Sequence, residues 1–151
     1  MDKTLWFDMD GTIADLYDVD GWLEMLRAEN PAPYVIAKPI YDMLELALIL
    51  NILQLDGWTI GIITWGAKNA SAEYNKAVAQ AKKEWLTKYN FPVDYFSFQS
   101  YGTPKRNAIK NRIGRNILID DNKDVRAEWN GETIDADTRN ILEELMKLIG
   151  K

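Results

Sequence analysis

Two acidic residues near the start of the chain, Asp8 and Asp10, are candidates for a catalytic pair. They follow the apolar residues 5–7 (LWF) and precede a Gly-Thr pair. Side chains that are two apart in an extended chain point the same way, so the two carboxylates would project together. Gly11 permits a backbone turn directly after them. One carboxylate can act as a nucleophile while the other transfers a proton.

Polar residues also follow three later apolar runs, where strands are expected to end. They are Thr64 after residues 58–63, Lys105 in the loop after residues 93–99, and Asp120 with Asp121 after residues 116–119. Trp65 and Gly66 come directly after Thr64. In a parallel sheet these ends lie at one edge, which is where such sheets bind ligands. Four carboxylates, one hydroxyl and one amine would then converge.

A cluster of four carboxylates predicts a bound cation, because the carboxylates repel one another unless a cation neutralises them. The chain has no Cys and no His, which excludes thiol nucleophiles, imidazole catalysis and the usual zinc ligands. Oxygen ligands alone favour Mg²⁺. A lysine and a hydroxyl beside the metal would complete a site for phosphoryl transfer, with one carboxylate forming an aspartyl-phosphate.

The surrounding sequence alternates between strand-like and helix-like segments. Strands are expected at residues 5–7, 58–64, 93–99, 116–120 and 132–134, and helices at 20–29, 40–55, 71–89, 105–112, 122–129 and 137–149. Pro39 is expected to begin the second helix, and the segment 30–33 (NPAP) to end the first. Residues 40–55 are apolar almost all round, which predicts a helix buried against a sheet. The pattern predicts an α/β fold with a parallel sheet of about five strands.

Length and charge limit the classes of function. The 151 residues are expected to form a single domain, 1–151, with a sizeable core. The net charge of -5 argues against broad nucleic-acid binding, so a nucleic-acid partner is not favoured. No contact with a membrane is expected. The start of the chain shows no signal peptide, so the expected location is the cytoplasm.

The order of these residues resembles the haloacid dehalogenase superfamily. "FDMDGT" matches its first motif, "IGIIT" its second, Lys105 its third and "ILIDD" its fourth. The resemblance implies a Rossmann-like sheet and a Mg²⁺-dependent phosphatase. Asp at position 10 is typical of the phosphatases of that superfamily, and the dehalogenases lack it. Receiver domains of signalling systems use similar residues in a different chain order.

The resemblance also implies a role for each motif residue. Asp8 would be the nucleophile and a metal ligand, and Asp10 the general acid–base with its backbone carbonyl on the metal. Thr64 and Lys105 would hold the phosphoryl group, with Lys110 as the reserve candidate for that lysine. Asp120 and Asp121 would bind or orient Mg²⁺. The backbone of Trp65 and Gly66 would contact the phosphate, and the Trp65 indole would either wall the pocket or simply pack.

Two branches of the superfamily suggest substrates. "FDMDGTIAD" resembles the 5'(3')-deoxyribonucleotidases, and "LIDDNKDVRAEW" the phosphatase domain of polynucleotide kinase-phosphatases. Residues 13–58 must hold a flap, a connecting helix and any cap, so the cap is expected to be minimal or absent. The expected substrate is a nucleotide or another small phosphorylated metabolite. The alternatives are a polynucleotide 3'-phosphatase and a non-catalytic phosphate-binding module, and a homo-oligomer is left open.

The basic stretch 105–115 is either a solvated face or a funnel for phosphorylated substrates.

Overall fold

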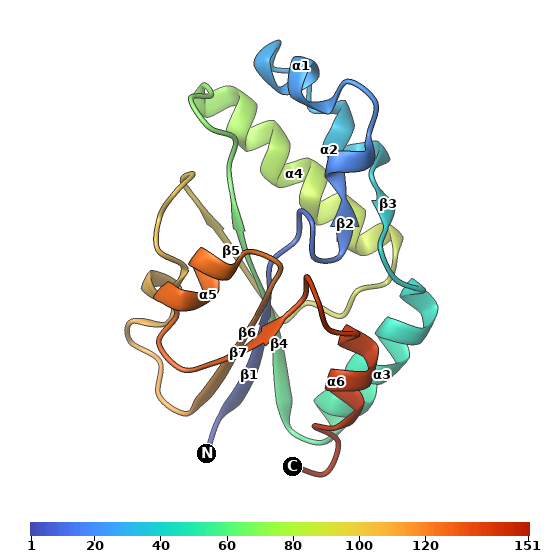
Figure 1. Ribbon diagram of the computed structural model, residues 1–151, viewed down its shortest axis with the longest axis vertical. Helices are drawn as coiled ribbons and strands as arrows, with labels where there is room; N and C mark the ends of the chain where they lie inside the picture. Colours follow the sequence, from blue (N-terminus) through green and yellow to red (C-terminus); the bar gives the residue numbers. More distant parts are fainter.

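A five-stranded parallel sheet forms the centre of the computed structural model, which describes residues 1–151 (Figure 1). The strand order is β5-β4-β1-β6-β7, and every pairing is parallel. The strands are β1 (Lys3–Phe7), β4 (Trp58–Trp65), β5 (Tyr95–Gln99), β6 (Arg115–Asp120) and β7 (Glu132–Asp135). This confirms the predicted fold class and places the carboxyl ends of all five strands at one edge.

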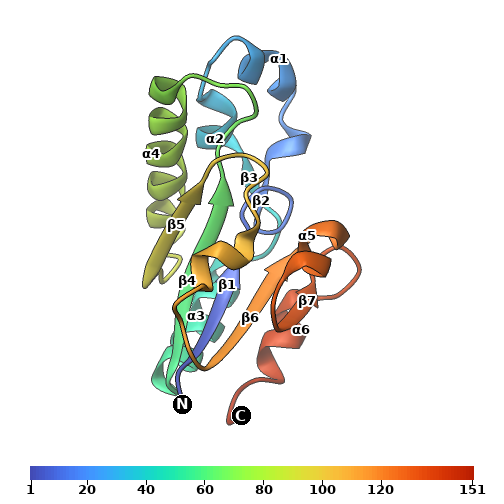
Figure 2. The same ribbon diagram turned by 90° about the vertical axis from the view of Figure 1, so that its left-hand side faces the viewer.

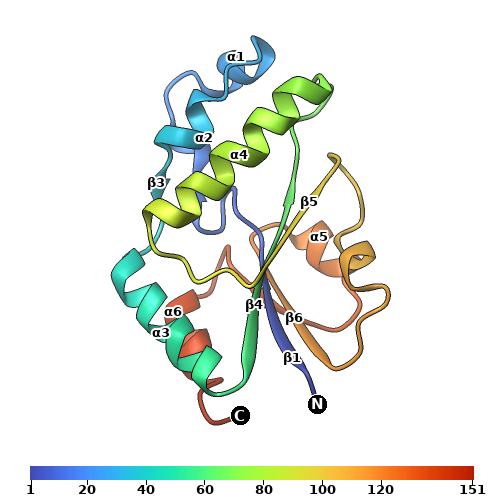
Figure 3. The ribbon, with the colours of Figure 1, turned by 180° about the vertical axis from the view of Figure 1, so that it is seen from behind.

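Helices cover both faces of the sheet, because its strands are apolar on both sides. Leu5 and Phe7 of β1 point into the larger core, and Trp6 points into a smaller core on the opposite face. The larger core lies under α3, α4 and α6, and the smaller one under η2 and α5 (Figure 3). The bounds are α3 (Met43–Leu55), α4 (Ala72–Lys88), η2 (Lys105–Ile109), α5 (Lys123–Glu128) and α6 (Ile141–Met146).

A small helical insert lies beyond the carboxyl edge of the sheet, beside α4 (Figures 1 and 2). It contains η1 (Leu16–Asp18), α1 (Trp22–Arg27) and α2 (Ala32–Ile36), and it starts and ends in the antiparallel strands β2 (Ala14–Asp15) and β3 (Lys38–Pro39). Leu16 and Tyr34 of the insert pack against Val78 and Ala81 of α4. The insert is therefore a minimal cap attached to the helical layer.

The prolines of this insert act only partly as the sequence predicted. The segment 30–33 follows the end of α1 as expected, but Pro31 also precedes a second helix, α2, which the sequence analysis did not predict. Pro39 belongs to β3, and α3 begins later, at Met43, where the Asp42 carboxylate accepts hydrogen bonds from the first-turn amides. A proline suits both a first helical turn and an edge strand, so its presence alone did not decide between them.

Helix α3 packs on the sheet as predicted, but only one of its faces is buried. Leu46, Leu50 and Leu53 are in the core, while Leu44 and Leu55 are 84% and 91% exposed. A sheet covers only one side of a helix, so an apolar sequence all round leaves apolar side chains in solvent.

Two helices in the C-terminal half of the chain are shorter than predicted. The expected helix over residues 105–112 is the short 3₁₀ helix η2, and α6 begins only at Ile141. The Asp135 carboxylate accepts hydrogen bonds from the amides of Asp137 and Thr138, which forms a turn where the last helix was expected to begin. None of the helices is long and apolar enough to cross a membrane.

Candidate active site

The loop after β1 places Asp8 at the carboxyl edge. The amide of Asp8 donates to the carbonyl of Ile119 on β6 at 3.0 Å, so the residue is still held by the sheet. The chain then turns through Gly11, whose φ is +83°. A Cβ at Gly11 would lie 2.5 Å from Oδ2 of Asp121. A glycine here therefore allows both the turn and the close approach of the two acidic segments.

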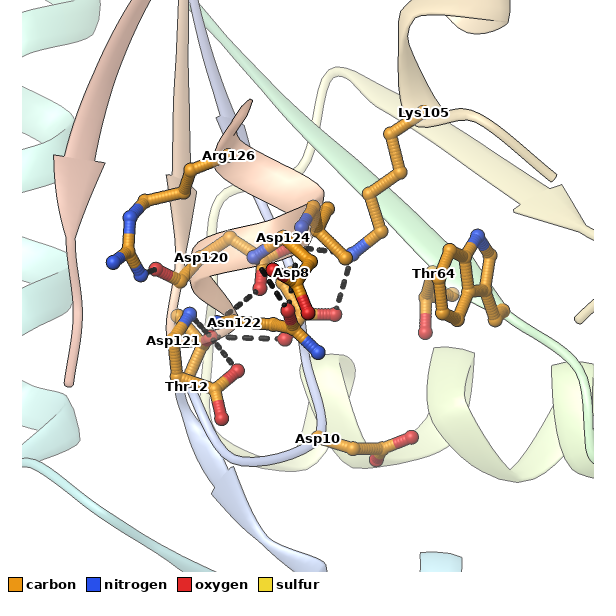
Figure 4. Close-up of polar contacts among 12 residues, drawn as sticks. Asp8, Asp10, Thr12, Thr64, Lys105, Asp120, Asp121, Asn122, Asp124 and Arg126 are labelled. Carbon is orange, nitrogen blue, oxygen red and sulfur yellow. Dashed lines mark hydrogen bonds and ion pairs between the residues drawn. The ribbon is translucent and has the colours of Figure 1, made fainter. Parts of the chain in front are cut away.

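Three carboxylates, from the ends of β1 and β6, meet at this loop. Ligand atoms of Asp8, Asp120 and Asp121 lie within 4.8 Å of one another (Figure 4). The hydroxyl of Thr12 lies 2.9 Å from Oδ2 of Asp8 and 3.1 Å from Oδ1 of Asp121. The amide of Asp121 donates to that same hydroxyl at 3.1 Å. The sequence interpretation gave Thr12 no role, although its place directly after Gly11 in the first motif was an available signal.

Lys105 is the cation of this cluster. Its Nζ lies 2.7 Å from Oδ1 of Asp8 and 2.7 Å from Oδ2 of Asp120, and the residue is 4% exposed (Figure 4). Burial lowers the pKa of Lys105, but the charges of Asp8 and Asp120 outweigh this effect and leave its pKa raised. Lys105 is therefore held as a cation. The reserve candidate, Lys110, is exposed outside this cluster.

The donor set fits a divalent cation with oxygen ligands. Burial, followed by the negative charge of Asp8, raises the pKa values of Asp120 and Asp121. Asp8, Asp120 and Asp121 would hold Mg²⁺, whose charge would relieve this repulsion. The Asp10 carboxylate lies apart from the three others (Figure 4), so a contact from Asp10 to the metal would come from its backbone carbonyl, as the resemblance implies.

Asp121 is expected to make the stability of the metal-free protein depend on pH. Burial and the charge of Asp8 raise the pKa of its carboxyl from 3.8 to about 7. The folded state thus holds this proton more tightly than the unfolded state does. The protonated Asp121 carboxyl therefore adds to the free energy of unfolding. This contribution is fully present below the pKa of Asp121 in the unfolded state and is lost as the pH rises through about 7. Compared with Asp121→Asn, the wild type should therefore lose thermal stability between about pH 5.5 and pH 8.

Thermal melting of both proteins, with and without Mg²⁺, would measure this difference. Metal binding needs deprotonated carboxylates, so Mg²⁺ should stabilise the wild type more at the higher pH than at the lower. Parallel pH profiles for the wild type and Asp121→Asn would contradict the prediction.

The second carboxylate of the first motif has a different partner, Lys82 of α4. Nζ of Lys82 lies 3.0 Å from Oδ2 of Asp10 and 2.6 Å from Oγ1 of Thr64. Burial raises the pKa of Asp10, and Asp8 adds to the shift although Lys82 opposes it. A raised pKa suits a carboxyl group that must donate a proton. The sequence interpretation gave Lys82 no role, and it is the packing of α4 that buries this side chain.

A cavity of about 390 Å³ opens beside these residues and has an aromatic lining. Its walls include Asp8, Asp10, Lys105 and Gly66, together with Tyr17, Trp22, Tyr34, Trp65 and Tyr101. The Trp65 indole N–H donates to the carbonyl of Thr103 at 2.8 Å, which fixes the ring in the wall. This supports the interpretation that Trp65 walls the pocket.

The amide of Gly66 is already engaged, because it donates to the carbonyl of Gln99 at 2.8 Å. Gly66 therefore lines the cavity without a free amide, and its contact with phosphate stays a prediction.

Only Lys105 of the basic stretch 105–115 lines this cavity, and a role of the stretch as a funnel stays a prediction. Arg115 pairs with Glu132, and the Arg112 guanidinium lies 4.5 Å from the centre of the Tyr95 ring. Trp129, part of the segment that resembles the polynucleotide phosphatases, is buried, and its indole donates to the carbonyl of Asn116 at 3.2 Å. Arg112, Arg115 and Trp129 thus have partners outside the cavity, and Trp129 packs in the core.

Comparison with known proteins bears on the fold. No protein-family model and no curated protein matches the chain. Among solved structures, the D,D-heptose 1,7-bisphosphate phosphatase from Burkholderia thailandensis is similar over 99% of both chains, with a TM-score of 0.57 and 10% identity. At this level of identity the similarity shows a shared fold. The chain therefore shares its α/β fold with a solved phosphatase, which is consistent with the haloacid dehalogenase-like fold that its four motifs predicted.

Proposed function

We propose that the protein is a Mg²⁺-dependent phosphomonoester hydrolase that acts through an aspartyl-phosphate on Asp8. The observation that carries this proposal is the convergence of Asp8, Asp10, Thr64 and Lys105 at the carboxyl edge of the sheet. Asp8 and Lys105 are in direct contact, and Asp10 and Thr64 share one lysine. The similarity to a solved phosphatase supports the same class of reaction.

In the first step, a carboxylate oxygen of Asp8 forms a bond to phosphorus as the bond to the leaving oxygen breaks. Asp10 gives its proton to that oxygen, which takes the electron pair of the broken bond. Lys105 and Thr64 donate hydrogen bonds to the phosphoryl oxygens, where negative charge is distributed in the transition state. When bound, Mg²⁺ would neutralise charge on the phosphoryl group and the carboxylates.

In the second step, the Asp10 carboxylate takes a proton from water, and the water oxygen attacks phosphorus. The bond between phosphorus and the Asp8 oxygen breaks, which releases phosphate and restores both carboxyl groups. A positioned acid–base group of this kind typically contributes about 10²–10⁴-fold to the rate.

The aromatic lining favours a substrate that carries a ring next to its phosphate. A nucleobase or a sugar ring could pack against Trp65 or Tyr17, whose side chains line the cavity. The similar solved structure is named as a phosphatase of D,D-heptose 1,7-bisphosphate, which is a sugar phosphate. Sugar phosphates are therefore candidate substrates alongside nucleotides. We propose a nucleotide or another small phosphorylated metabolite as the substrate.

Phosphate release from a defined panel would test this function. The panel holds nucleoside 5'- and 3'-monophosphates, sugar phosphates, an aryl phosphate and a 3'-phosphorylated oligonucleotide, each with Mg²⁺ and with chelator. We expect Mg²⁺-dependent release, with ring-bearing small substrates preferred over the oligonucleotide. No release across the panel from folded, Mg²⁺-bound protein would instead favour a phosphate-binding module without catalysis.

A further inference from the structure

Lys82 is a buried lysine whose hydrogen bonds join two separate parts of the candidate site. It lies in the middle of α4, is 1% exposed and does not line the cavity. Its Nζ donates to Oδ2 of Asp10 at 3.0 Å, to Oγ1 of Thr64 at 2.6 Å and to the carbonyl of Trp65 at 2.9 Å. Three donors thus meet three acceptors, and the ammonium is fully satisfied.

Packing alone does not explain a lysine at this position. An ammonium is costly to bury unless it is paired and hydrogen-bonded, whereas methionine would fill a similar volume at no such cost. The rings of Tyr34 and Phe98 lie with their centres 5.1 Å and 5.8 Å from Nζ, which places the charge between aromatic walls. The surroundings of Lys82 therefore hold its ammonium group in one place.

The contact with Thr64 fixes the direction of a hydroxyl group. An ammonium can only donate, so Oγ1 of Thr64 must accept from Lys82. The hydroxyl proton of Thr64 therefore does not point at Lys82, and this hydroxyl donates no hydrogen bond to another group of the protein. Donation from Thr64 is what a phosphoryl oxygen requires.

The contact with Asp10 fixes a carboxyl group in the same way. Oδ2 of Asp10 is held by Lys82, and no other hydrogen bond to the Asp10 carboxyl is made by the protein. Oδ1 is thus left for the leaving group or for water. One ammonium therefore orients both the acid–base group and the hydroxyl donor.

We propose that Lys82 is a positioning residue for phosphoryl transfer, which sets the orientation of Asp10 and Thr64 without touching the substrate. This inference rests on the proposed phosphatase function. Because Lys82 acts on groups used in the transition state, its loss should lower kcat and leave KM nearly unchanged.

The test compares Lys82→Met with the wild type and with Lys76→Met, which removes an exposed lysine of the same helix. Two substrates separate the effects: an alkyl phosphate, whose leaving oxygen needs a proton, and an aryl phosphate, whose leaving group needs it less. We expect kcat of Lys82→Met to fall by about 10²-fold on the alkyl phosphate and by less on the aryl phosphate. KM should change by less than about threefold, and Lys76→Met should match the wild type.

Chemical rescue adds a readout that a purely structural role would not give. The chain contains no cysteine, so Lys82→Cys supplies a single thiol. Aminoethylation of that thiol in denaturant, followed by refolding, returns an ammonium on a side chain of nearly the original length. We expect the aminoethylated protein to regain most of the lost kcat on the alkyl phosphate.

Each outcome bears on one claim. A wild type that releases no phosphate overturns the proposed function, and the inference falls with it. An active wild type with an equally active, folded Lys82→Met overturns the positioning role alone. If Lys82→Met and Lys82→Gln both fail to fold by circular dichroism, Lys82 is a structural residue and the inference is wrong.

Discussion

Replacing Asp8 with Asn should abolish phosphate release and leave the fold intact. An amide cannot supply the carboxylate oxygen that attacks phosphorus, and removal of a catalytic nucleophile costs more than about 10³-fold. The fold should persist because Asn has nearly the same shape, and because Lys105 keeps its contact with Asp120 at 2.7 Å. Loss of one charge also relieves the repulsion among Asp8, Asp120 and Asp121.

Steady-state phosphate release and thermal melting would measure both halves of this expectation. The melting temperature of Asp8→Asn should stay within about 4 °C of the wild type, which corresponds to about 1 kcal/mol for a chain of this size. Asp20→Asn, at an exposed position, is the matched control and should keep full activity. Turnover by Asp8→Asn at a rate close to that of Asp20→Asn would show that Asp8 is not the nucleophile.

Replacing Lys105 with Met should reduce both activity and stability. Lys105 is the cation between Asp8 and Asp120, and without it these carboxylates face each other with no counter-charge. Removing one partner of a buried ion pair typically costs about 3–5 kcal/mol. Loss of a donor to the transferring phosphoryl group should lower kcat by about 10²-fold or more.

Urea unfolding with and without Mg²⁺ would measure the stability change, and phosphate release the activity change. Mg²⁺ should restore part of the stability, because its charge can replace that of the lysine among the same carboxylates. Lys110→Met removes an exposed lysine from the same stretch and should behave as wild type. If the two variants have equal activity and equal stability, the assignment of Lys105 to the site is wrong.

The exposed face of α3 illustrates one limit of prediction from sequence. The segment is apolar almost all round, and this composition predicts burial but not how much of the helix the sheet can cover. Leu44 and Leu55 are exposed because the sheet and α6 contact only the opposite face. The direction of each side chain depends on the packing of the whole helix.

The residues that end the strands could be predicted from the local sequence. Asp8, Thr64 and Asp120 each come at the end of an apolar run, and parallel strands bring such ends to one edge. Lys105 was predicted from its position after the third run and is in contact with Asp8. These predictions needed only local pattern and strand direction.

Only the tertiary structure identified Lys82 and the cap. Lys82 is separated from Asp10 by 72 positions, and Lys83 beside it is exposed. Which lysine of a helix points inward depends on how that helix packs, because one residue of sequence turns a side chain by about 100° around the axis. The helical insert reaches the site through a similar long-range contact, because Tyr34 packs on α4 and also lines the cavity. Local sequence fixes where elements end, whereas packing between distant elements decides which side chains enter the site.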